Sequence, residues 1–416
     1  MSLQGTFSPP GDKSISHRLV LLSLLAGGTT RVANLSPGAD VQTSLKAVGA
    51  LGVEVRSQDG QVVMTGAQGR IKDRAAVDCG NSGTTMRLLM GLLAGRPGQY
   101  TLDGDHSLRR RPMERVAAPL RLMGAKVQCQ AGKCPLTIVG GALKGIEYDL
   151  PRASAQLKSA LLLAGLQASG PTLVKGLVHS RDHTEKLLAL MGGQIREIED
   201  GLRVAPSALS LPSSFRVPGD ISSAAFFLCA AALIPGSQVR AEGILLNPTR
   251  TGFLDVLKRM GADLEVEVQG QTPEPWGRVR VGYSPDLAGV QIGPQEIPLL
   301  VDEVPILTLV ASQARGETVF DEVGELRLKE SDRLAAVASQ LGLMGARIAV
   351  QGERMVIQGP TPLKAPARLD SLADHRLAMT LRLALVLAGS RGFIEGEDWA
   401  RISYPGFHQD LKRLSR

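Results

Sequence analysis

The sequence predicts an α/β protein with two domains, each built of three β-α-β-α-β-β units of roughly 70 residues. Two recurring signatures support this prediction. In the first, an apolar helix end leads into a glycine and then a strand, at Gly52, Gly124, Gly192, Gly261 and Gly345. In the second, a helix rich in small residues ends at a glycine before a strand, at Gly28, Gly98, Gly170, Gly236, Gly316 and Gly392. Six such units fill the chain of 416 residues.

The first unit shows each element in order. Residues 14–26 have the pattern of an apolar helix, and residues 29–35 form a strand with β-branched side chains. Residues 40–50 are amphipathic and predict a second helix, with Asp40 as its N-cap. The turn Gln58-Asp59-Gly60 predicts a hairpin of strands 53–55 and 61–65, and a strand at 75–78 leads into the next unit.

The domain boundaries follow from the sixth unit, because the chain stops before its last strands. We expect residues 3–8 to complete that unit. Residues 1–12 and 219–416 would then form a discontinuous domain that contains both termini, with residues 13–218 inserted. The active site is expected in the cleft between the two domains.

Composition excludes several classes of protein. Aromatic residues are only 3% of the chain, which disfavours a base-stacking nucleic-acid surface. Residues 19–26 form an apolar stretch interrupted only by Ser23, and no apolar run in the chain is long enough to cross a bilayer. The N-terminus lacks the charged and apolar regions of a signal peptide, so a cytoplasmic location is expected.

The chemically informative residues lie at equivalent places, just before the first helix of each unit. These segments are residues 10–18, 81–87, 152–158, 218–223, 301–303 and 374–376. Helix N-termini present free N–H groups and a partial positive charge, so anions bind there readily. For any single segment, ordinary N-capping by Ser, Asn and Asp is the more common explanation. The recurrence, with Lys13, Arg18, Arg87 and Arg376 close by, favours anion binding.

Two further basic segments are Arg109-Arg110-Arg111 and the alternating run 329–333. The second is either a solvated helical turn or a pair of cations that hold two anionic groups around a carboxylate. No Walker A sequence or strand-linked GxGxxG occurs, and the spacing of His179 and His183 is more typical of a surface helix than of a metal site. We therefore predict no metal site and find no motif for a nucleotide.

Six segments together resemble one known family. They are 13–18 (Lys-Ser-Ile-Ser-His-Arg), 81–87, 111–113, 154–156, 329–333 (Lys-Glu-Ser-Asp-Arg) and 374–376 (Asp-His-Arg). In this order they resemble the 5-enolpyruvylshikimate-3-phosphate synthases, over essentially the whole chain. The resemblance implies a fold similar to an inverse α/β barrel in each domain. It also implies a cofactor-free transfer of the enolpyruvyl group of phosphoenolpyruvate to the 5-hydroxyl of shikimate 3-phosphate, through a tetrahedral intermediate.

The resemblance implies a role for each matched residue. The catalytic groups would be Lys13, Asp302 and Glu330. Shikimate 3-phosphate would be held by Lys13, Ser14, Arg18, Ser154, Ala155, Gln156, Arg181, Asp302 and Lys329. Phosphoenolpyruvate would be held by Lys13, Gly83, Arg111, Gln156, Arg333 and Arg376. These small anions are the expected partners of a monomer that binds neither nucleic acid nor membrane.

Three positions depart from the family's common pattern, namely Arg401, Glu325 and Gly83. Many members have a Lys near Arg401 and an Asn in place of Glu325, and some have Ala in place of Gly83. Two alternatives remain. A UDP-N-acetylglucosamine enolpyruvyl transferase shares the repeat fold but uses an Asn-Lys motif and a loop Cys. An RNA-end-processing or polyanion-binding protein fits the pI of about 9.4, but would need a basic stripe.

Overall fold

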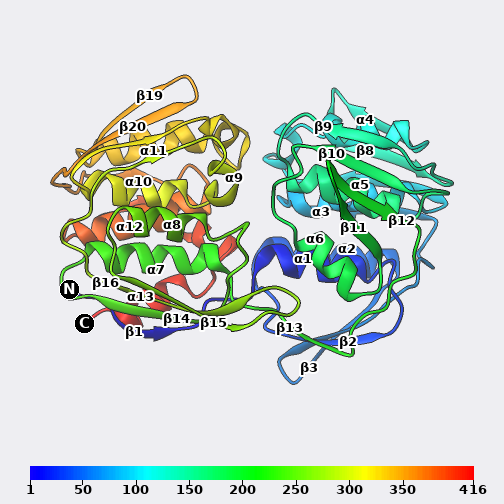
Figure 1. The fold of residues 1–416 in the computed structure, drawn as a ribbon, viewed down its shortest axis with the longest axis horizontal. Coiled ribbons are helices and arrows are strands. Elements are labelled where there is room, and N and C mark those ends of the chain that lie inside the picture. The colour runs from blue at the N-terminus through cyan, green and yellow to red at the C-terminus, as the bar shows by residue number, and fades with distance from the viewer. The chain divides into compact units, whose positions relative to one another are not determined.

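The computed structural model describes residues 1–416 and divides into two compact units. Unit 1 comprises Met1–Pro10 and Pro218–Arg416, and unit 2 comprises Gly11–Val217. Both termini belong to unit 1 and lie side by side (Figure 1). Ser2 and Arg416 exchange two backbone hydrogen bonds, of 3.0 and 2.9 Å.

Unit 2 contains six α-helices, a short 3₁₀ helix and twelve strands. In chain order they are α1 (Lys13–Leu22), β2 (Thr29–Ala33), α2 (Ala39–Leu51), β3 (Glu54–Gln58), β4 (Gln61–Thr65), β5 (Arg74–Asp78), α3 (Gly83–Ala94), β6 (Gly98–Asp103), η1 (Leu108–Arg110), α4 (Glu114–Leu122), β7 (Lys126–Gln130), β8 (Lys133–Gly140), β9 (Glu147–Leu150), α5 (Ala155–Gly165), β10 (Thr172–Gly176), α6 (His183–Leu190), β11 (Gln194–Ile198), β12 (Gly201–Ala205) and β13 (Ser214–Arg216).

Unit 1 repeats the same kinds of element. They are β1 (Gln4–Phe7), α7 (Ile221–Leu233), β14 (Gln238–Leu245), α8 (Gly252–Arg259), β15 (Leu264–Gly270), β16 (Trp276–Gly282), β17 (Gln291–Ile292), α9 (Ile297–Leu300), α10 (Val304–Gln313), β18 (Gly316–Phe320), η2 (Val323–Leu328), α11 (Arg333–Leu343), β19 (Arg347–Gln351), β20 (Arg354–Gly359), β21 (Leu369–Asp370), α12 (His375–Leu387), β22 (Ile394–Glu395), η3 (Glu397–Ile402) and α13 (Phe407–Leu414).

The sheets confirm the predicted α/β class and its repeats. Unit 2 has three four-stranded sheets, ordered β13-β2-β4-β3, β5-β6-β8-β7 and β11-β12-β10-β9. Unit 1 has β1-β14-β16-β15, β17-β18-β20-β19 and a two-stranded sheet of β21 and β22. Each four-stranded sheet joins one parallel pair to an antiparallel hairpin, as β5 runs parallel to β6 while β8 pairs antiparallel with both β6 and β7.

Strands β1 and β13 correct one expectation. Strand β1 pairs in parallel with β14, with Gln4 opposite Gln238, so residues 3–8 complete the fourth unit and not the sixth. Strand β13 precedes α7 in the sequence but pairs with β2. Strand β1 thus precedes α1 in the sequence but belongs to unit 1, and β13 precedes α7 but belongs to unit 2. Each of the two strands pairs within its own compact unit.

The helices predicted for the first unit are present, but their first and last residues differ from the prediction. The first helix stops at Leu22, four residues before the predicted end. The second begins at Ala39 with Gly38 as N-cap, so the prediction that Asp40 caps it is wrong. Asp40 lies in the first turn of α2, and its carboxylate pairs with Lys13 instead.

The first helix of each repeat is almost wholly buried. All thirteen residues of α7 are buried, and in α3 only Thr84 is partly exposed. The small residues on these helices allow very close packing, since a Cβ on Gly91 of α3 would collide with the carbonyl oxygen of Ala160 on α5. Tight packing of this kind holds the helix N-termini in place.

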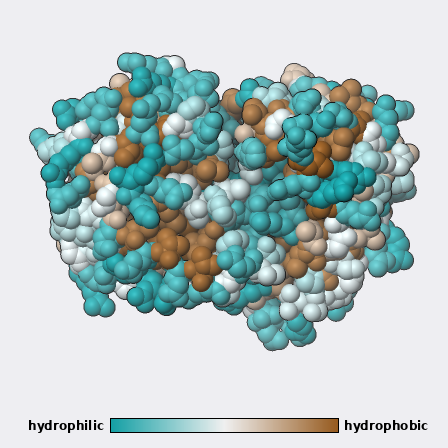
Figure 2. Space-filling view, viewed as in Figure 1, coloured by the Kyte–Doolittle hydropathy of each residue, from teal (hydrophilic) through white to brown (hydrophobic).

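Surface hydropathy is mixed. Figure 2 shows hydrophilic residues over both units on the face drawn, with hydrophobic residues gathered in separate patches. None of the helices combines the length and the apolar composition that a membrane span needs.

Candidate active site

Side chains of the predicted motifs cap the buried helices. Asp12 accepts a hydrogen bond from the N–H of Ile15 at the start of α1, and Ser82 and Ser154 do the same for α3 and α5. In unit 1, Asp220 and Asp374 cap α7 and α12. Capping thus accounts for these five residues, and the cations beside them remain available for other contacts.

Lys13 begins α1 and pairs with Asp40 on α2. Its Nζ lies 2.9 Å from Asp40 Oδ2, and His17 Nε2 lies 3.4 Å from the same oxygen. Burial alone would raise the pKa of Asp40, but the Lys13 charge and the His17 hydrogen bond hold this pKa well below its usual range. Asp40 therefore stays a carboxylate that orients Lys13.

His17 links this pair to α3. Its Nδ1 lies 2.7 Å from Ser44 Oγ, which lies 2.7 Å from Thr85 Oγ1. Thr85 Oγ1 in turn donates to Ser82 Oγ at 2.7 Å. A chain of buried polar groups thus connects the N-termini of α1 and α3, and Asp40 and Ser44 are members that the sequence did not predict.

The pH dependence of stability should show this environment. Burial, the largest cause, lowers the pKa of His17 below its ordinary value of 6.5. As pH falls below 6.5 the unfolded chain therefore takes up a proton that the folded chain resists, and stability is lost, by at most about 1.4 kcal/mol per pH unit for one proton. We expect the melting temperature to fall more between pH 7.5 and 5.5 in the wild type than in His17→Gln. An equal fall in both proteins would contradict this environment for His17.

The N-terminus of α3 lies against two arginines and one glutamine. Arg87 donates to Gln156 Oε1 at 2.5 Å and to the Pro112 carbonyl at 3.2 Å. Gln156 donates to Thr84 Oγ1 at 3.0 Å. A Cβ on Gly83 would lie 2.9 Å from Arg87 Nη1 and 3.1 Å from Arg111 Nη1. Gly83 thus leaves room for both guanidinium groups.

Arg18 connects three helices of unit 2. Its Nε donates to Thr184 Oγ1 at 2.7 Å, and its Nη2 donates to Ser159 Oγ at 3.0 Å. The same side chain reaches the Ser14 carbonyl at 3.0 Å. Arg181 lies just before α6, the helix that contains Thr184. The structure therefore places Arg18 beside α5 and α6, the helices next to the predicted binding residues.

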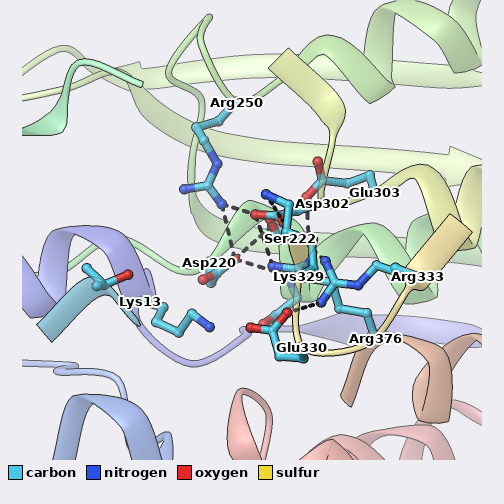
Figure 3. Close-up of polar contacts among 12 residues, drawn as sticks. Lys13, Asp220, Ser222, Arg250, Asp302, Glu303, Lys329, Glu330, Arg333 and Arg376 are labelled. Atoms are coloured by element: carbon cyan, nitrogen blue, oxygen red, sulfur yellow. Dashed lines mark hydrogen bonds and ion pairs between the residues drawn. The ribbon is translucent and has the colours of Figure 1, made fainter. Parts of the chain in front are cut away.

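In unit 1, three cationic side chains meet Asp302 (Figure 3). Arg333 Nη1 lies 3.4 Å from Oδ1, Arg376 Nη2 lies 3.5 Å from Oδ2, and Lys329 Nζ lies 4.0 Å from Oδ1. Glu330 joins this cluster through Arg333, at 2.6 Å. Five predicted residues from three segments of the sequence are thus brought together.

Asp374 fixes two of these segments. This carboxylate is 0% exposed, accepts from Arg333 Nε at 2.8 Å, and accepts from the backbone N–H of Arg376 at 2.8 Å. Burial alone would raise its pKa and lower that of Arg333. Their mutual attraction overcomes both effects, so the pKa of Asp374 is lowered and that of Arg333 is raised.

A second buried arginine borders the cluster in Figure 3. Arg250 Nη2 donates to Ser222 Oγ at 2.7 Å and lies 3.7 Å from Asp220 Oδ1. The segment that contains Asp220 and Ser222 could be predicted from the sequence, but Arg250 could not, because no motif marks it.

One interpretation of the basic segments is wrong. Residues 329–331 are not a helical turn, because α11 begins only at Arg333 and Asp332 is its N-cap. Arg401 is exposed and pairs with Asp398 at 3.4 Å, and Glu325 pairs with Lys329 at 3.4 Å.

Comparison with known families decides the relationship. The family model described as EPSP synthase (3-phosphoshikimate 1-carboxyvinyltransferase) matches residues 1–411. The chain belongs to the EPSP synthase family. The 3-phosphoshikimate 1-carboxyvinyltransferases of Bacillus licheniformis and Geobacillus kaustophilus are 45% and 46% identical to it. These alignments cover 100% and 99% of this chain, and 98% of each relative.

Solved structures agree with this EPSP synthase assignment. The EPSP synthase of Acinetobacter baumannii has a TM-score of 0.86 at 38% identity, over 100% of this chain and 96% of its own. The enolpyruvyl transferase NikO of Streptomyces tendae shares the fold, with a TM-score of 0.78 at 17% identity, over 99% of this chain and 95% of its own. The family description makes the chain an enolpyruvyl transferase of the shikimate pathway, and neither alternative is favoured.

Proposed function

We propose that this EPSP synthase family member joins the enolpyruvyl group of phosphoenolpyruvate to the 5-hydroxyl of shikimate 3-phosphate at the residues described above. The observation that best supports these positions is the convergence of Arg333, Arg376 and Lys329 on Asp302, with Glu330 held beside them. Both substrates carry a carboxylate and a phosphate, which guanidinium and ammonium groups recognise.

The proposed chemistry has an addition and an elimination. In the addition, the 5-hydroxyl oxygen bonds to C2 of phosphoenolpyruvate, Asp302 takes the hydroxyl proton, and Glu330 gives a proton to C3. In the elimination, Glu330 takes a proton back from C3, the double bond re-forms, and the C2–O bond to phosphate breaks. Lys13, oriented by Asp40, stabilises the charge that develops on the substrates. Asp302 gives the hydroxyl proton to the departing phosphate, so both carboxyl groups return to their starting states and the atoms balance without a cofactor.

Binding is divided among the remaining residues. Shikimate 3-phosphate would contact Ser14, Arg18, Ser154, Ala155, Gln156 and Arg181 from unit 2, and Asp302 and Lys329 from unit 1. Phosphoenolpyruvate would contact Gly83, Arg111 and Gln156 from unit 2, and Arg333 and Arg376 from unit 1. Catalysis would therefore need residues of both units, and the small anionic substrates are the proposed partners.

Release of inorganic phosphate tests this function. With phosphoenolpyruvate as donor, we expect release with shikimate 3-phosphate, far less with shikimate, and none with UDP-N-acetylglucosamine. Shikimate is a matched control because it lacks only the phosphate. Release that depends on UDP-N-acetylglucosamine would overturn the proposal.

Gly83→Ala should weaken phosphoenolpyruvate binding. The added methyl group would push the tips of Arg87 and Arg111, and overpacking of this kind costs about 1–3 kcal/mol. The KM for phosphoenolpyruvate should rise roughly tenfold, while the KM for shikimate 3-phosphate changes less. Gly49→Ala on α2 is the control, since its Cβ would meet nothing within 4 Å. Equal changes in the two variants would remove Gly83 from the site.

A further inference from the structure

Lys158 is a buried lysine of unit 2 to which the proposed reaction assigns no role. It lies on α5 with its side chain only 2% exposed. A lysine ammonium has three N–H donors, and burying it is costly unless each donor has an acceptor. Nζ meets three acceptors: the carbonyl oxygens of Val178 at 2.9 Å and Ser180 at 3.1 Å, and Glu185 Oε1 at 2.6 Å.

Both carbonyls belong to residues 177–182, which connect β10 to α6. The carbonyl of Ser180 is part of the peptide unit that leads into Arg181. Because that unit is planar, a hydrogen bond to its oxygen also restrains the orientation of the Arg181 backbone nitrogen. Near the start of the segment, Val178 N–H donates to the Gly176 carbonyl at 2.7 Å. Lys158 therefore holds residues 177–182 by two hydrogen bonds, and one of them lies next to Arg181.

The lysine also ties this connection to the start of α5. Ser154, Ala155 and Gln156, which precede Lys158 by two to four residues, are proposed ligands of shikimate 3-phosphate. Arg18 bonds to Ser159 and Thr184, so it holds the same two helices together. The distance between Arg181 and the other proposed ligands therefore depends on Lys158.

Glu185 completes the arrangement from the first turn of α6. Burial raises the pKa of Glu185, and the Lys158 charge opposes this rise. Removing Lys158 alone would leave a buried carboxyl without its partner. A double substitution that also neutralises Glu185 avoids that penalty.

We propose that Lys158 is a positioning residue that holds Arg181 in place and thereby sets the affinity for shikimate 3-phosphate. The inference rests on the proposed function of Arg181. Lys158 itself touches no reacting atom.

The test compares Lys158→Met/Glu185→Gln with Glu185→Gln. Methionine keeps the apolar stem and loses all three donors. In the double variant we expect the KM for shikimate 3-phosphate to rise roughly tenfold. The kcat, and the KM for phosphoenolpyruvate at saturating shikimate 3-phosphate, should change less than about threefold. Glu185→Gln keeps both carbonyl bonds and should change each constant less than about threefold. Equal rises in both KM values, or a tenfold rise in Glu185→Gln, would contradict the proposal.

Limited trypsin digestion gives a second readout that does not depend on activity. We expect trypsin to cleave after Arg181 only if residues 177–182 lose their contacts with Lys158 and move away from α5. The folded wild type should resist this cut, and the double variant should be cut there. Rapid cleavage after Arg181 in the folded wild type would overturn the proposal even if the double variant failed to fold. A wild type that resists trypsin but releases no phosphate would instead count against the proposed function alone.

Discussion

Glu330→Gln is expected to lower turnover by roughly 10²- to 10⁴-fold, the usual range for loss of a general acid–base group. Glutamine keeps the shape of the side chain and can still accept the hydrogen bond from Arg333, which is 2.6 Å away in the wild type. The affinities for both substrates, measured by titration calorimetry, should therefore change much less than kcat.

Glu325→Gln is the matched control for this variant. Glu325 lies in η2, just before Glu330, and pairs with Lys329 at 3.4 Å. It has no role in the proposed proton transfers, so turnover should stay near that of the wild type. Near-normal turnover in Glu330→Gln would remove Glu330 from the mechanism.

Arg333→Met is expected to give the largest loss of stability. Arg333 is 1% exposed and faces Asp374, Glu330 and Asp302. Its removal leaves Asp374 buried without a counter-charge, and breaking a buried pair in this way costs about 3–5 kcal/mol. Urea unfolding followed by circular dichroism would measure the change.

Two further variants control for the size of this effect. Arg333→Met/Asp374→Asn removes both charges, and asparagine can still cap α12, so the double variant should be more stable than Arg333→Met. Arg327→Met breaks an exposed pair with Asp332 at 2.9 Å and should cost no more than about 1 kcal/mol. A loss in Arg333→Met as small as that in Arg327→Met would contradict the buried pairing.

The repeat could be predicted from the sequence because its units share glycine-terminated helices and all but the sixth have a hairpin. The partners of β1 and β13 could not be predicted. The truncated sixth unit predicts that residues 3–8 complete it, and no pattern in the sequence indicates a partner for β13. The structure instead pairs β1 with β14 and β13 with β2, a choice that depends on contacts between residues more than 180 positions apart.

The site could be predicted in part. Lys13, Arg333 and Arg376 belong to motifs that a single sequence displays. The partners that hold them are less visible, because they lie on other elements and have no motif. Asp40 has the pattern of a helix cap, and only the fold brings its carboxylate to Lys13. In the sequence, Lys158 is one polar residue in an apolar helix. Its carbonyl partners are about 20 residues away in the chain, so the sequence does not indicate them.

The addition–elimination route is tested most directly by running the reaction in D₂O. Protonation of C3 by Glu330 would there make a CH₂D group, and the later loss of a proton would leave deuterium in the vinyl group. We therefore expect NMR to detect deuterium in the enolpyruvyl group of the product, with phosphate released only when shikimate 3-phosphate is present. A vinyl group containing only protium, or phosphate released from phosphoenolpyruvate alone, would contradict the account.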